Sequence, residues 1–235
     1  MIVEYNAAAK ATPPKSDTPE AESFQLDEVE RIRECLQYEP LKWRVATHLL
    51  LLSGCRRGEI AGLKWDHVDW QNSQIKIDQA LLSSNKGGVY EDTTKTSTTR
   101  YIKLPQETMQ LLKEYRTWYT EQRLLNGDRW VNSGYVFIKD NGEPMHPDSL
   151  TGWLAKFSKK YDLPHIHPHK FRHTMASLLF YNKVDSIAIS KRLGHAKVST
   201  TTDIYSHIIK QADEEASECI ADAILRSPKE KQSAV

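Results

Sequence analysis

One group of reactive side chains lies at a corner between two expected helices, in the run Ser53 to Ile60 (SGCRRGEI). Gly54 suits the end of a helix, and Arg56 stands where the next helix begins. Backbone N–H groups and a guanidinium are therefore gathered where an anion is favoured, and Glu59 can orient Arg56. A plain helix–helix corner with a surface ion pair is the alternative interpretation.

A second group surrounds Lys95, in the run Thr93 to Arg100 (TTKTSTTR). A lysine on a hairpin tip can reach into a groove, and hydroxyl groups bind phosphates without reading base sequence. Lys86 and Lys103 lie on the same expected sheet and compete with Lys95 for this role. In isolation, a solvent-exposed hairpin tip is the better explanation of the run.

The third group is a histidine-rich tract, His165 to His173 (HIHPHKFRH). Pro168 fits the first turn of a helix, which makes His169 and Arg172 neighbours on one face. An imidazole beside a guanidinium suits proton transfer next to a stabilised oxyanion. The tract could instead bind a metal, or His169 and His173 could satisfy buried polar groups. Against a metal site, no Cys, Asp or Glu lies close to the tract in the sequence.

The fourth group is Leu193-Gly194-His195, followed ten residues after the histidine by Tyr205. The glycine ends an expected helix and presents His195 at its end. Tyr205 is one of ten tyrosines, so on its own it is most simply a core residue.

Together, the order and spacing of these four groups resemble the catalytic domain of tyrosine recombinases, the phage integrase family. The resemblance covers about residues 24–225. It implies metal-free and ATP-independent cleavage and rejoining of DNA strands, through a 3′-phosphotyrosine intermediate and without a cofactor. The implied catalytic residues are Arg56, Lys95, His169, Arg172, His195 and Tyr205, with Glu59 in support and Arg57, Thr96 and Lys170 as candidate contacts to DNA phosphates.

The family chemistry gives each implied residue a role. Tyr205 is the nucleophile, and Arg56, Arg172 and His195 stabilise the charge of the transition state. Lys95 is the general acid for the leaving oxygen, and His169 moves the proton at the tyrosine.

Other functions remain open at this point. Relaxation of DNA by an enzyme resembling type IB topoisomerases would use the same chemistry. A catalytically idle DNA-binding module and a metallohydrolase built on the histidine tract are the alternatives from other classes. The resemblance further implies double-stranded DNA as partner, and a homotetramer on paired DNA sites that is a monomer without DNA. The C-terminal helix could dock on its own domain or on a neighbouring protomer.

Charge is segregated along the 235 residues, although the net charge is only +1. Residues 32–207 hold 25 Lys and Arg against 18 Asp and Glu, and all nine histidines, while both ends are acidic. A basic body is compatible with a polyanionic partner. Three dispersed cysteines argue against a disulfide framework, and the absence of a long apolar run or signal-peptide core predicts a cytoplasmic protein without membrane contact. The family resemblance implies that a bacterium, a phage or a mobile element encodes it.

Hydrophobic periodicity predicts a mainly α-helical chain with one small three-stranded antiparallel sheet, an α+β fold. The family resemblance implies that this fold is the tyrosine-recombinase catalytic-domain fold. Helices are expected over about 26–36, 41–52, 56–63, 105–126, 147–160, 168–181, 185–193, 198–206 and 209–225, and strands over 75–82, 89–94, 100–104 and 136–138.

Three parts of the chain are expected. Residues 1–23 have the composition of a linker, with no separate N-terminal DNA-binding domain ahead of the catalytic domain at 24–207. Residues 208–235 form a C-terminal helix and tail.

Overall fold

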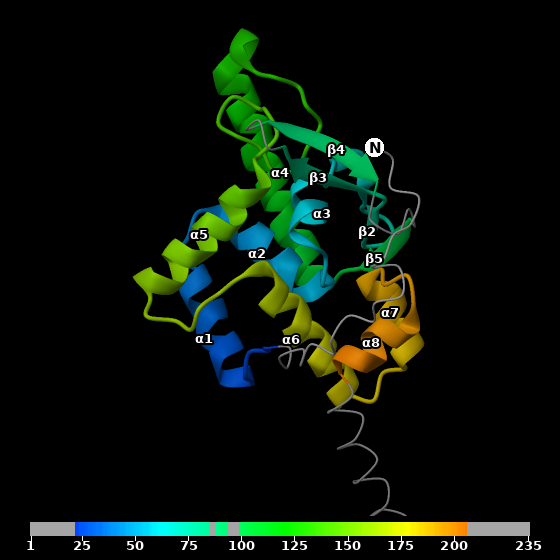
Figure 1. Ribbon diagram of the computed structural model, residues 1–235. Helices are drawn as coiled ribbons and strands as arrows, with labels where there is room; N and C mark the ends of the chain where they lie inside the picture. The colour runs from blue at the N-terminus through cyan, green and yellow to red at the C-terminus, as the bar shows by residue number, and fades with distance from the viewer. Residues whose placement is uncertain (1–21, 85–87, 94–98, 206–235) are drawn as a thin grey trace, which may run out of the picture.

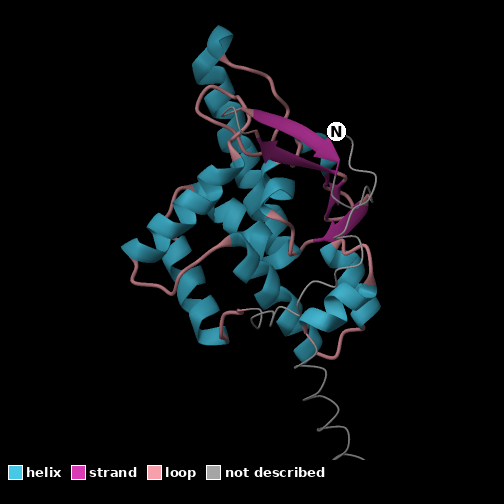
Figure 2. Cartoon of the chain, in the orientation of Figure 1, coloured by secondary structure: helices cyan, strands magenta, loops and turns pink. Residues whose placement is uncertain are grey.

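A computed structural model describes residues 22–84, 88–93 and 99–205 of the chain. Helices make up most of this part, and two small antiparallel sheets lie along one side of them (Figures 1 and 2). The α-helices are α1 Leu26–Leu36, α2 Leu41–Ser53, α3 Arg57–Ala61, α4 Gln106–Asn126, α5 Pro147–Lys160, α6 Pro168–Tyr181, α7 Ser186–Leu193 and α8 Val198–Ile204. The expected helices in these regions are therefore confirmed, and the one expected over 209–225 lies outside the described residues.

The strands form a three-stranded sheet in the order β1-β2-β5 and a separate two-stranded ribbon of β3 and β4. Ile75 pairs with Val68 on one side and with Ile102 on the other. A small three-stranded antiparallel sheet is present as predicted, but one of its strands, at Val68–Asp69, was not expected, and the strand expected over 89–94 pairs with β3 in the ribbon. The strands are β1 Val68–Asp69, β2 Gln74–Ile77, β3 Gln79–Ser83, β4 Val89–Thr93 and β5 Arg100–Lys103.

The single strand expected over 75–82 is wrong, because the chain changes sheets at Asp78. Ile75 and Ile77 alternate with polar residues under the three-stranded sheet, but Ala80 and Leu81 are both buried in succession. Their backbone comes close to α3: a side-chain carbon added at Gly58 or Gly62 would lie within 3.0 Å of the Leu81 backbone. Close packing on α3 accounts for the separate ribbon.

The strand expected over Val136–Ile138 is also wrong. Val136, Phe137 and Ile138 are all buried in a row, and their segment makes only isolated bridges, including one between Ile138 and Pro144. Proline has no N–H to donate, so a ladder cannot extend through that position. The apolar run is an irregular buried segment of the core.

Two of the hydrophobic clusters define the interior around the candidate site. The largest is built from α1, α2, α4, α5 and the three-stranded sheet. A smaller one joins α6, α7 and the end of α8 through Met175, Ile189, Leu193 and Tyr205. Because α2 packs on α6 and α6 on α7, the two clusters meet along α6, which carries His169, Arg172 and His173.

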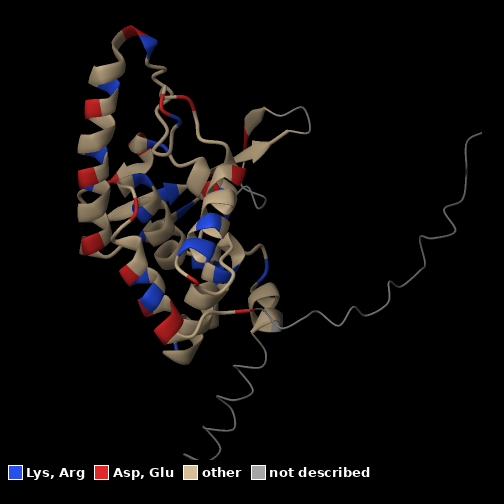
Figure 3. Ribbon diagram, turned by 90° about the vertical axis from the view of Figure 1, so that its left-hand side faces the viewer, with Lys and Arg blue, Asp and Glu red and all other residues tan. Residues whose placement is uncertain are grey.

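The outer surface is of mixed charge. Figure 3 shows acidic and basic residues alternating along α4, which projects from the body of the molecule. Interspersed charges of both signs are typical of a solvated helix face. The long helix α4 is therefore a structural element with an ordinary exposed face rather than a basic surface.

Candidate active site

Two left-handed glycines end the helices that border the site. Gly54 ends α2 and Gly194 ends α7, each with φ of 66°. A side chain is strained in this conformation, and a Cβ at Gly194 would also lie 2.7 Å from the Arg100 guanidinium. The two helices can therefore present their terminal carbonyls to the same space.

Arg172 occupies that space and joins the two helix ends. Its guanidinium donates to the carbonyl of Gly54 at 2.6 Å and to the carbonyl of Leu193 at 2.7 Å, and the residue is only 4% exposed. The carbonyl end of a helix carries partial negative charge, which stabilises a cation there. Burial, and then the charge of Arg56, lower the pKa of Arg172 to about 10, so the group stays protonated at neutral pH.

Arg56 comes to the same place from the start of α3. Its guanidinium donates to the carbonyl of Gly194 at 3.4 Å. Gly194 directly follows Leu193, whose carbonyl accepts from Arg172. The backbone N–H and the guanidinium of Arg56 both donate to the carboxylate of Glu59, at 2.7 and 3.0 Å. The predicted orientation of Arg56 by Glu59 is therefore present in the structure.

Arg100 is a buried cation that the motifs did not single out. It donates two hydrogen bonds to Glu59, at 3.1 and 2.6 Å, and a third to the carbonyl of Arg192. Burial alone would raise the pKa of Glu59, but the hydrogen bonds and charge of Arg100 hold that pKa below its usual value. Glu59 is thus a buried carboxylate shared by Arg56 and Arg100. The sequence contains one signal for Arg100, its position at the end of the Lys95 run, and none for its ion pair with Glu59.

We predict that Arg100→Met destabilises the fold strongly. Removing one partner of a buried ion pair leaves the other charge without compensation, which costs about 3–5 kcal/mol in comparable sites. The free energy of unfolding, measured with urea, should fall by about 3 kcal/mol because Arg56 still compensates part of the Glu59 charge. Arg33→Met is the matched control, since the Arg33–Glu30 pair is exposed; equal stability of the two variants would contradict the prediction.

His195 and Tyr205 are fixed by one residue of α8, Thr201. The Nδ1 atom of His195 lies 2.7 Å from the Thr201 hydroxyl, and the Thr201 carbonyl accepts from the Tyr205 N–H at 3.2 Å. Thr201 is fully buried, which holds both contacts in place. The threonine run before Tyr205 was visible in the sequence, but not that its middle member connects the imidazole to the tyrosine.

Tyr205 is buried, with 1% of its surface exposed, and its ring packs against Phe180. Its hydroxyl lies 2.7 Å from the Nδ1 atom of His173. Burial raises the pKa of Tyr205, and the charge of Arg172 partly opposes that rise. The phenol is therefore protonated at neutral pH and needs a base to become a nucleophile.

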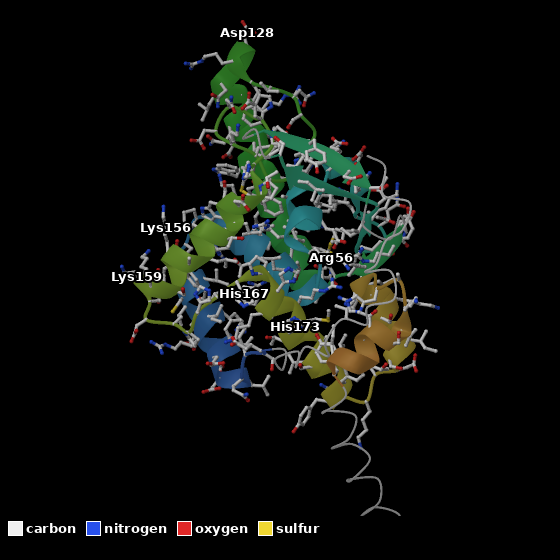
Figure 4. The ribbon with its side chains drawn as sticks, viewed as in Figure 1. Arg56, Asp128, Lys156, Lys159, His167 and His173 are labelled. Atoms are coloured by element: carbon white, nitrogen blue, oxygen red, sulfur yellow. The ribbon has the colours of Figure 1, made fainter. Side chains whose placement is uncertain are left out.

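The imidazoles around the two guanidiniums are neutral. Burial, with Arg172 next, lowers the pKa of His195 to about 4, and burial with His169 next lowers that of His173 to about 4. The pKa of His169, which is exposed on the first turn of α6, is lowered by partial burial and by Arg172. Figure 4 shows Arg56 and His173 in the centre of the molecule, away from Asp128 at the far end of α4.

The remaining candidates have other surroundings. Arg57 forms an ion pair with Asp148 at 2.5 Å, and the Lys170 ammonium lies 4.4 Å from the centre of the Phe24 ring. Lys95 and Thr96 lie outside the described residues, as does Lys86. Lys103 is exposed on β5.

A cavity bordered by β5 and α7 adjoins the site. Its walls include Thr99, Arg100, Gly194 and His195. The end of the Lys95 run, where β5 begins, therefore lies beside His195.

Neither a metal cluster nor a membrane span is found in the described part of the chain. No three His, Cys, Asp or Glu side chains there are grouped so that they could hold a metal ion. No helix among those residues is both long and apolar enough to cross a bilayer.

Comparison with known proteins identifies the relatives of this arrangement. The profile of the Phage integrase family matches residues 22–212. The chain is 30% identical over 227 residues to a protein named tyrosine recombinase XerC-like from Caldanaerobacter subterraneus subsp. tengcongensis, covering 91% of this chain and 57% of that protein. It is 25% identical to the ICEBs1 integrase of Bacillus subtilis, covering 86% and 54%. The chain thus spans little more than half the length of these relatives.

Solved structures give the same result. A structure of the Tn1549 transposon integrase in complex with a circular intermediate DNA has a TM-score of 0.71 and 25% identity, covering 88% of this chain and 69% of that one. A second complex of that integrase has a TM-score of 0.68 and 26% identity, covering 81% and 63%. The helical fold with its small sheets is therefore shared with DNA-bound integrases.

Proposed function

Because the chain belongs to the phage integrase family, we propose that it cuts and rejoins DNA strands through a covalent bond between Tyr205 and a 3′-phosphate. One observation carries this proposal. Arg56 and Arg172, far apart in the sequence, bind the consecutive carbonyls of Gly194 and Leu193, directly ahead of His195. Two guanidiniums and an imidazole thereby face a common space in which a phosphate can be bound.

The two guanidiniums bind the non-bridging oxygens of the scissile phosphate. Each presents N–H donors in a planar fork, which stabilises the spread negative charge of the transition state better than a lysine can. His195 adds a third donor: when the Thr201 hydroxyl donates to Nδ1, the ring proton is on Nε2 and can be donated to a phosphate oxygen. Donors held in advance at a site where charge develops are a large source of rate enhancement.

Strand cleavage exchanges one phosphoester bond for another. The Tyr205 oxygen forms a bond to phosphorus, the bond to the 5′-oxygen breaks, and the leaving oxygen takes a proton. We assign this proton to Lys95, because Thr99, four residues later, borders the same cavity as His195. The covalent intermediate conserves the energy of the phosphodiester, so that rejoining needs no ATP.

The decisive experiment is incubation of the chain with nicked duplex DNA, in which release of a short fragment traps the covalent intermediate. A protein–DNA adduct mapped to Tyr205 by peptide mass spectrometry is expected. An adduct on another tyrosine would show that this other tyrosine is the nucleophile. If no adduct forms, DNA binding without cleavage is the only function left for the site.

We propose recombination of paired sites, rather than relaxation of supercoiled DNA, as the overall reaction. The relatives named integrase and tyrosine recombinase support this choice. In the same proposal, the chain is a monomer when free and assembles as a tetramer on two DNA sites, in the cytoplasm where its substrate is. Residues 24–207 act as the catalytic domain and 208–235 as a separate C-terminal segment. Light scattering with and without paired DNA sites would measure the assembly.

DNA binding should depend steeply on salt. Each phosphate contact adds about −0.9 to the slope of log K against log salt, because bound cations are released from DNA. Arg57→Gln should make the slope shallower by about 1 if Arg57 contacts a phosphate, whereas Arg33→Gln should leave it unchanged. Fluorescence anisotropy over a salt series measures the slope, and an affinity independent of salt would contradict a phosphate-lined groove.

A further inference from the structure

The hydroxyl of Tyr205 is in contact with His173, a residue with no role in the functional assignment above. The Nδ1 atom of His173 lies 2.7 Å from the phenol oxygen, and the two rings are 5.9 Å apart. Within residues 22–84, 88–93 and 99–205, no second side chain forms a hydrogen bond with this hydroxyl. Phe180 packs on the tyrosine ring, which restricts where the hydroxyl can point.

His173 is also held in position by its helix. It follows Arg172 directly on α6, and it lies one helical turn after His169, which is exposed. His173 itself is half-buried between these groups and α8. Of these two histidines one turn apart, it is His173 that contacts the Tyr205 hydroxyl, although the family resemblance had implied proton transfer by His169.

We propose that His173 is the catalytic base that takes the phenol proton of Tyr205 as the tyrosine attacks the phosphate, an inference that rests on the proposed function. In cleavage, the proton moves from the tyrosine oxygen to Nδ1 of His173 while the oxygen–phosphorus bond forms and the bond to the 5′-oxygen breaks. In rejoining, the 5′-hydroxyl gives its proton back to Lys95 and attacks the phosphorus, the tyrosine–phosphorus bond breaks, and His173 returns its proton to the tyrosine oxygen.

The surrounding charges make this base responsive to the substrate. Arg172, His167 and His169 face His173 from α6, and Tyr205 faces it from the end of α8. Without DNA, burial first, and then the charges of His169 and Arg172, disfavour protonation of the imidazole and lower its pKa. A bound phosphate compensates Arg56 and Arg172 and so favours a protonated His173. A bound phosphate therefore raises the pKa of His173 and makes it a stronger base.

One test needs no catalysis. In protein with ¹⁵N-labelled histidine, NMR should show His173 as the neutral form with its proton on Nε2 and a hydrogen-bonded, unprotonated Nδ1. Tyr205→Phe should shift the Nδ1 signal, and the His165 signals should stay unchanged. A proton on Nδ1 would mean that His173 donates to the tyrosine, which overturns the proposal whether or not the chain cleaves DNA.

The second test is single-turnover cleavage of nicked DNA, with rates relative to the unmodified chain. His173→Asn places an amide oxygen near the position of Nδ1 and can accept the hydrogen bond, but it cannot take a proton. A loss of about 10²–10⁴-fold is expected, as for other general bases. His165→Asn is the matched control, because His165 is exposed in the same tract, and it should cleave normally.

Two further measurements separate catalysis from packing. Imidazole added to His173→Ala should restore part of the cleavage rate, since a small base can enter the space left by the ring. DNA with a 5′-bridging sulfur, whose leaving group needs no acid, should not rescue His173→Asn. Full activity of His173→Asn, or its rescue by the sulfur substrate, would overturn the assignment. An unmodified chain that forms no adduct would instead refute the proposed function.

Discussion

Tyr205→Phe is expected to abolish the covalent protein–DNA adduct while DNA binding persists. The substitution removes the oxygen that forms the bond to phosphorus and keeps the ring that packs on Phe180 in the cluster of α6, α7 and α8. It also leaves Nδ1 of His173 without its hydrogen-bond partner. An unsatisfied buried polar group lowers the free energy of unfolding by about 1–3 kcal/mol. The adduct is measured on nicked DNA by denaturing gel electrophoresis, and binding by anisotropy.

Tyr181→Phe is the matched control for this experiment. Tyr181 ends α6 and is 65% exposed, so loss of its hydroxyl should change neither adduct formation nor binding. A Tyr205→Phe protein that still becomes attached to DNA would show that another residue is the nucleophile. A parent chain that binds DNA without any adduct would favour the DNA-binding module.

Arg172→Lys is expected to lower the cleavage rate by on the order of 10²-fold or more, by comparison with the loss of a single transition-state donor. The guanidinium donates in two directions at once, to the carbonyls of Gly54 and Leu193, and still has N–H groups for a phosphate. A lysine ammonium is a compact charge on a flexible stem and cannot keep this forked geometry. Single-turnover cleavage of nicked DNA measures the effect.

The fold must be checked separately, because Arg172 is buried between two helix ends. Thermal unfolding and DNA affinity of Arg172→Lys show how much of the loss is structural. Arg123→Lys is the matched control, because it makes the same substitution at an exposed position of α4 that lacks the buried contacts of Arg172. It should cleave DNA as the parent chain does. A near-normal cleavage rate for Arg172→Lys would mean that the forked contact is unimportant.

Local patterns predicted the helices well, because each carries its own apolar spacing and end signals. Gly54 and Gly194 mark helix ends in the sequence, and both have the left-handed conformation expected there. The strands were harder. A run of alternating residues from Ile75 onward gave no local sign that Asp78 divides two sheets, since that division depends on how Ala80 and Leu81 pack on α3.

The candidate site divides in the same way. The sequence singled out Arg56, Arg172, His195 and Tyr205 as candidate catalytic residues, because their types and order form a recognisable series. It did not identify Arg100, which is important only because its guanidinium meets the buried Glu59 across the fold.

The sequence by itself determined the helical class of the chain, its family resemblance and its candidate catalytic side chains, since these depend on residue type and local spacing. Only the tertiary structure decided which imidazole meets the tyrosine and which carbonyls hold the guanidiniums. His169 and His173 are one helical turn apart and chemically identical, so that no local rule distinguishes them. The packing of α8 on α7, and of α7 on α6, brings the Tyr205 hydroxyl to His173, and that contact is set by the burial of side chains distant in sequence.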